Sequence, residues 1–212
     1  MSDQRAPQPS PGLSTVQILA YLYSVVVALA LTSSVQTIVN PGGIPARNLF
    51  EIPVEELLLF GSFVLVIVPF YHGAIRALVT VFREDITQTK GGTMLITYGA
   101  MLLEALVFYA MATSIRSLFS FIFWFAFLMV IDTIWVGLAH ASGATNQDAP
   151  VKWGILNGGV AVFLVLFWNI ATDQSLSRYA LILTASIVRT SLDYYLTRDY
   201  YFPTARSVAT NP

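Results

Sequence analysis

Charged and polar side chains interrupt several long apolar stretches of this 212-residue chain. A charge at the centre of a membrane helix costs about 2.5–3.5 kcal/mol on insertion scales, so such side chains usually face a partner, a bound solute or water. Acidic and basic groups held together in that setting can bind an ion, relay a proton or act as an acid–base pair. The candidate residues for such a site are His72, Arg76, Glu104, Asp132, Asn157, Arg189 and Asp193.

Two pairs among these candidates have helical spacing. His72 and Arg76 are four residues apart, as are Arg189 and Asp193, so each pair lies on one face of a helix. The second pair can form an ion pair along its helix, whereas Arg76 is left to meet an acid from another helix or to extend to the lipid headgroups. The five charged candidates sum formally to −1, and one added proton brings the sum to zero. This balance favours a proton-linked site.

The stretch PFYHGAIRAL, residues 69–78, combines these polar residues with features that bend a helix. Pro69 removes a backbone hydrogen bond and leaves a carbonyl free about one turn earlier. Gly73 and Ala77 form a face of small residues that a neighbouring helix can approach closely. We therefore expect this segment to kink its helix and to hold polar side chains against another helix.

The composition is that of a membrane protein. Hydrophobic residues make up 56% of the chain and charged residues only 11%, with a mean hydropathy of +0.67, whereas soluble domains average roughly a quarter charged residues. A net charge of −1 without a basic run argues against a nucleic-acid partner. The absence of cysteine excludes disulfides, thiolate nucleophiles and cysteine-ligated metals. The expected partners are the lipid bilayer and either a second copy or another membrane subunit.

Six stretches are long enough for the roughly 20 apolar residues that a helix needs to cross a bilayer. They span residues 13–39, 54–82, 92–114, 117–141, 153–171 and 177–197. We therefore predict an all-α integral membrane protein, a six-transmembrane-helix bundle with short loops over residues 13–200. Residues 1–12 are predicted to be a flexible polar tail and residues 201–212 a C-terminal tail.

Lysine and arginine in the short loops predict the orientation of this bundle. One side carries Arg5, Arg83, Lys90, Lys152, Arg198 and Arg206, and the other Arg47, Arg116 and Arg178. Six against three favours cytoplasmic N- and C-termini in a multi-pass protein of a plasma (inner) membrane. Trp153 and residues 199–202 then fall at the cytoplasmic interface, where aromatic rings prefer to lie. At a rise of 1.5 Å per residue, the seven candidates share a layer between the midplane and that interface.

Three kinds of function fit such a layer. A channel or transporter for an ion, a proton or a small polar solute is favoured, because charged residues on several helices and a kinked helix are typical of conduits. A non-transporting membrane subunit or signalling protein would use the layer to fix helix packing or to bind a partner helix. An intramembrane enzyme on a lipid-type substrate would use Glu104, Asp132 and His72 as acid–base groups.

The enzyme is the least favoured of the three. Candidate hydroxyl nucleophiles lack the local signature of an intramembrane hydrolase, and hydroxyls in membrane helices usually bond to their own backbone. His72 and His140 are not spaced as metal ligands are, so the sequence predicts neither a metal nor another cofactor.

Overall fold

The computed structural model describes residues 15–41, 47–81, 91–141, 148–170 and 175–202. Within these ranges the chain forms α1 (Thr15–Val39), the 3-10 helix η2 (Leu49–Glu51), α2 (Val54–Val81), α3 (Gly91–Thr113), α4 (Leu118–Ala141), α5 (Asp148–Ile170), α6 (Leu176–Leu196) and α7 (Arg198–Tyr201). No β-strand occurs in the described part of the chain. The prediction of an all-α fold is therefore confirmed.

The long helices begin and end within two residues of the predicted spans, with one exception. α5 begins at Asp148 rather than at residue 153, so that Pro150 lies inside its first turn. A proline is tolerated there because the N–H groups of the first turn have no acceptor within the helix. The sequence interpretation assigned this proline to the preceding connector, because a proline more often marks a boundary than a helix interior.

Four helices in the described part of the chain are long and apolar enough to cross a membrane by length and composition. The qualifying segments are Gln17–Val39, Val54–Leu78, Leu118–Ala141 and Ala149–Asn169. A shorter apolar segment, Thr97–Thr113, lies in α3. The chain is thus a helical protein of membrane type. α6 does not qualify because Arg178, Arg189 and Asp193 lower its hydropathy.

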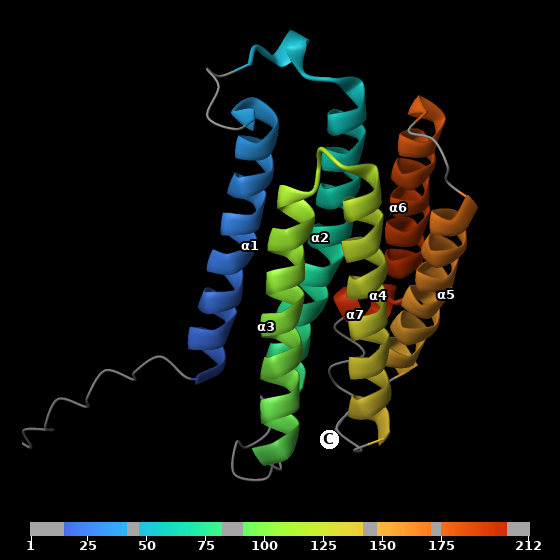
Figure 1. Ribbon diagram of the computed structural model, residues 1–212. Helices are drawn as coiled ribbons and strands as arrows, with labels where there is room; N and C mark the ends of the chain where they lie inside the picture. Colours follow the sequence, from blue (N-terminus) through green and yellow to red (C-terminus); the bar gives the residue numbers. More distant parts are fainter. Residues whose placement is uncertain (1–14, 42–46, 82–90, 142–147, 171–174, 203–212) are drawn as a thin grey trace, which may run out of the picture.

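The long helices run side by side in alternating directions (Figure 1). α1, α3 and α5 begin at the end of the bundle where α2, α4 and α6 finish, and we call this the α7 end. The opposite end carries η2 and is called the η2 end. α4 packs extensively on α5, α2 on α6, and α3 on both α1 and α4, whereas α5 and α6 touch only sparsely.

Large apolar side chains fill the half of the bundle nearer the η2 end. Phe63 of α2, Phe108 of α3 and Phe121 and Phe125 of α4 are fully buried in one hydrophobic core. At the η2 end itself, the buried carboxylate of Glu56 lies 3.4 Å from Arg47 and 3.3 Å from Arg116. The buried charges discussed below lie in the other half, where the core is no longer wholly apolar.

Candidate functional site

Pro69 of α2 marks the point at which α6 docks. Pro69 lies inside α2 and has no N–H to donate to the carbonyl of Leu65, one turn earlier. The hydroxyl of Thr190 on α6 donates to that carbonyl instead, at 2.7 Å. The guanidinium of Arg189 lies 4.6 Å from the ring centroid of Phe70. α6 is thereby bound to α2 beside Pro69, and its residues Arg189 and Asp193 are buried in the bundle interior.

We expect Thr190→Val to lower the free energy of unfolding by about 1 kcal/mol, because it leaves the Leu65 carbonyl without a donor. The loss should shrink in a Pro69→Ala background, where the restored N–H of residue 69 can bond to Leu65. Unfolding in mixed micelles of the four proteins of this double-mutant cycle measures both effects. An equal loss in both backgrounds would show that the hydroxyl does not compensate for the proline.

The small face predicted at Gly73 and Ala77 accommodates aromatic rings. A Cβ atom on Gly73 would lie 3.3 Å from the Trp153 ring and 3.4 Å from the Tyr201 hydroxyl. Both aromatic residues are buried. The ring of Trp153 therefore packs into the space that glycine leaves on α2, inside the bundle.

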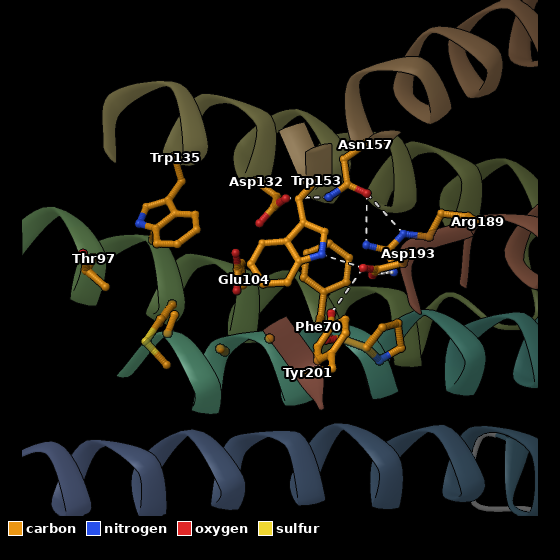
Figure 2. A pocket seen from close by; sticks show the side chains of 16 residues that line it. Phe70, Thr97, Glu104, Asp132, Trp135, Trp153, Asn157, Arg189, Asp193 and Tyr201 are labelled. Carbon is orange, nitrogen blue, oxygen red and sulfur yellow. Dashed lines mark hydrogen bonds and ion pairs between the residues drawn. The ribbon is translucent and has the colours of Figure 1, made fainter. Parts of the chain in front are cut away.

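The carboxylate of Asp193 is the most heavily bonded group of the site (Figure 2). Its Oδ2 atom lies 3.2 Å from Nη1 of Arg189, so the ion pair expected along α6 is present, with both side chains almost fully buried. Its Oδ1 atom accepts hydrogen bonds from Trp153 Nε1 at 2.5 Å, Thr197 Oγ1 at 3.2 Å and Tyr201 Oη at 3.3 Å. Three neutral donors and one cation therefore surround the carboxyl group of Asp193.

Tyr201 connects α7 to this cluster and to Pro69 of α2. Its hydroxyl also donates to the carbonyl of Pro69 at 3.2 Å. Burial, and after it the nearby Asp193 carboxylate, raises the pKa of the Tyr201 hydroxyl far above its usual range, so this group remains a donor. Tyr201 was predicted to begin the C-terminal tail, but α7 extends through it and its ring is buried in the bundle.

Asn157 connects the ion pair to a second acid. Its Oδ1 atom accepts from Arg189 Nε at 3.1 Å and from Nη2 at 3.0 Å, while its Nδ2 atom donates to Oδ2 of Asp132. Asn157 is 1% exposed and Asp132 7%. The amide thus joins the guanidinium on α6 to a carboxylate on α4.

Glu104 completes the cluster from α3. Its carboxyl lies on the same side of the cluster as that of Asp132, and both line one cavity (Figure 2). The hydroxyl of Tyr23, on α1, donates to Oε2 of Glu104 at 3.4 Å. Glu104 is 5% exposed. Five of the seven predicted residues, on α3, α4, α5 and α6, therefore form one buried cluster.

His72 and Arg76 lie beside this cluster, against α7. The His72 ring centroid is 4.5 Å from that of Tyr201, and its Nδ1 atom is 3.5 Å from the hydroxyl of Tyr194. Arg76 donates from Nε to the backbone carbonyl of Tyr200 at 3.1 Å, and its guanidinium lies 5.6 Å from the centroid of the Tyr200 ring. Arg189 of α6 is thus the cation paired with Asp193, and Arg76 contacts Tyr200 of α7.

A cavity of about 40 Å³ runs beside the cluster, in the half of the bundle toward the α7 end. Its walls include Thr97, Glu104, Asp132, Trp135 and Asn157 (Figure 2). The Nε1 atom of Trp135 is buried and has no hydrogen-bond partner among the described residues. A cavity of this size has room for water-sized molecules, and the indole N–H offers them a donor.

Sequence reasoning missed the neutral donors around the acids, namely Tyr23, Trp135, Trp153, Thr197 and Tyr201. Tyrosine, tryptophan and threonine are common in membrane helices and at their ends, so their residue types carried no signal. Only the depth of the acids could have indicated that buried donors must surround them.

The arrangement can bind a small cation, water or protons through paired carboxyl groups. No three histidine, aspartate or glutamate residues of the described part of the chain are grouped closely enough to hold a metal ion. Comparison with protein-family models, curated proteins and solved structures finds no match to this chain. The functional conclusion therefore rests on the chemistry of these residues.

Proposed function

We propose that the protein is a channel or transporter for a proton or another small cation, and that this solute binds in the cavity beside Glu104 and Asp132. The observation that carries this proposal is that two buried carboxyl groups, those of Glu104 and Asp132, line one cavity. A purely structural cluster has no need of a cavity or of two neighbouring acids.

The charge of the cluster supports a cationic solute. Glu104, Asp132 and Asp193 with Arg189 have a formal charge of −2 if all four are ionised. Arg189 balances Asp193, with which it pairs at 3.2 Å. The excess charge lies on the other two acids, and burying it without compensation is costly. A bound cation or added protons would remove that cost. The site should therefore bind cations in preference to anions or neutral solutes.

The apolar half of the bundle supports a conduit that is closed toward the η2 end. Phe63, Phe108 and Phe121 lie between the cavity and that end. A second hollow of about 350 Å³ lies at the η2 end, with polar walls that include Gln36, Asn40 and Arg116. Two hollows that contain polar side chains, separated by a dry layer, are expected of a closed channel, or of a transporter in one of its access states.

We further propose that α3 and α6 also cross the membrane, which gives six spans and cytoplasmic termini in a plasma (inner) membrane. The charges Arg189 and Asp193 are 3% and 1% exposed, so the hydropathy of α6 understates how apolar its outer surface is. The exposed large hydrophobic residues of that surface are Leu176, Leu181, Ile187, Val188, Leu192, Tyr195 and Leu196, and its exposed polar residues are Ser177, Thr184 and Ser191.

Cysteine labelling tests the six spans, because the chain contains no cysteine of its own. We expect Phe50→Cys and Ser175→Cys to react with a membrane-impermeant maleimide on intact cells. Asp199→Cys should react only after permeabilisation, because α6 lies between Ser175 and Asp199. Labelling of Ser175→Cys and Asp199→Cys from the same side would show that α6 does not cross.

The proposed function is tested by flux through the purified protein in proteoliposomes, with proton- and cation-sensitive dyes inside. We expect wild-type protein to dissipate an imposed gradient that protein-free vesicles hold. Folded protein that leaves all such gradients intact would contradict the conduit and favour a membrane subunit or an intramembrane enzyme.

A further inference from the structure

A large apolar groove lies between α5 and α6, apart from the cavity that Glu104 and Asp132 line. Its volume is about 630 Å³, within the range of ligand-binding sites. Its walls include Ile155, Gly159 and Phe163 of α5 and Val188 and Leu192 of α6. Of the seven candidate site residues, only Arg189 also lines this groove. The groove is therefore a second, largely separate candidate binding site.

The groove exists because α5 and α6 are held by different neighbours. α5 is drawn onto α4, where a Cβ on Gly154 would be only 3.1 Å from the Val136 side chain and one on Gly158 would be 3.6 Å from Thr133. α6 is bound to α2 through the hydrogen bond from Thr190. Between them, a Cβ on Gly159 would meet nothing within 4 Å. The opening is therefore built into the packing of both helices.

The walls are suited to hydrocarbon. Ile155, Val188 and Leu192 are each more than a third exposed in the bundle alone. The hydroxyl of Thr184, also in the wall, donates to the carbonyl of Ala180 and so is already satisfied. A groove of this kind at membrane depth gains nothing from water and is filled most favourably by an acyl chain.

The end of the groove nearest the α7 end adds a positive charge. Lys152 belongs to its wall, and the ammonium donates to the carbonyl of Leu196 at 3.4 Å. An ammonium has three donors, so this contact leaves capacity for a phosphate oxygen. No acidic residue belongs to the described walls of the groove. An apolar groove with a basic group at one end complements an anionic phospholipid.

We propose that the α5–α6 groove binds an acyl chain of an anionic phospholipid, whose phosphate contacts Lys152. The lipid comes from the leaflet at the α7 end. This site does not depend on the transport function, because it uses a different surface and a different ligand.

The test measures phospholipid retained by protein extracted from phosphatidylcholine vesicles that contain a minority of phosphatidylglycerol. Native mass spectrometry counts the bound lipids and identifies their headgroups. We expect wild-type protein to retain phosphatidylglycerol in preference to phosphatidylcholine. Gly159→Leu should lower total retention roughly tenfold, because the new side chain occupies the space of the acyl chain.

Two further variants separate lipid binding from misfolding. Gly137→Leu is the matched control, because a Cβ at Gly137 on α4 also meets nothing within 4 Å, and it should retain lipid as wild type does. Lys152→Gln changes an exposed side chain and should lower the preference for phosphatidylglycerol roughly fivefold.

Three results would overturn the proposal. One is equal lipid retention by Gly159→Leu and Gly137→Leu. Another is equal retention of both headgroups by wild-type protein. The third is the dissociation of a dimer by Gly159→Leu without lipid loss, which would assign the groove to a second copy of the chain.

Discussion

Asp132→Asn is expected to reduce flux in proteoliposomes to the level of protein-free vesicles, while the protein remains folded. Asparagine has nearly the shape of aspartate and can still accept the hydrogen bond from Asn157. It cannot carry a negative charge or release a proton. If Asp132 binds the transported cation or proton, the path loses its central group without losing its packing.

The matched control is Asp199→Asn on α7, where the aspartate side chain is 88% exposed and lies outside the cluster. We expect this variant to keep wild-type flux. Glu104→Gln, which neutralises the other carboxyl of the pair, should reproduce the loss seen for Asp132→Asn. Wild-type flux in both cluster variants would mean that the cavity is not on the path and that the polar layer is structural.

Arg189→Leu is expected to lower the free energy of unfolding by about 3–5 kcal/mol, the usual cost of removing one partner of a buried ion pair. The side chain is 3% exposed and contacts Asp193, Asn157 and the ring of Phe70. Its removal leaves the Asp193 carboxylate charged in the interior and Asn157 without its donor. Unfolding in mixed micelles, followed by tryptophan fluorescence, measures the loss.

Arg198→Leu is the control for this prediction. Arg198 also pairs with an aspartate, but both side chains are more than two-thirds exposed, so we expect a loss of at most about 1 kcal/mol. Adding Asp193→Asn to Arg189→Leu should restore part of the stability, because the uncompensated charge disappears. Additive losses in the double variant would show that Arg189 stabilises the bundle through packing alone.

Composition and helical periodicity were enough to predict the class of the protein. Apolar stretches interrupted by short polar connectors predicted the long helices to within two residues at nearly every end. Local signals sufficed because a helix satisfies its backbone hydrogen bonds within its own segment, so that length and hydropathy decide where it forms. Pro150 was the exception, since a proline can either precede a helix or lie in its first turn.

The depth of the charged residues likewise predicted that Glu104, Asp132, Asn157, Arg189 and Asp193 share one layer. It could not predict which groups meet. Charge counting left Arg76 either to meet an acid or to extend to the lipid headgroups. In the structure Arg189 donates to Asn157, and Arg76 donates to the carbonyl of Tyr200 on α7. Depth along a helix is a one-dimensional quantity, and it does not define the direction in which each helix turns its side chains.

The sequence by itself therefore determined a membrane-type helical chain with buried charges at a common depth, because insertion energetics act on each helix separately. The tertiary structure decided the rest. The carbonyl of Leu65, which Pro69 leaves without a backbone donor, accepts a hydrogen bond from Thr190 of α6, and this contact fixes the rotation of α6 that brings Arg189 and Asp193 inward. Such long-range contacts depend on how several helices pack at once, and no local pattern encodes them.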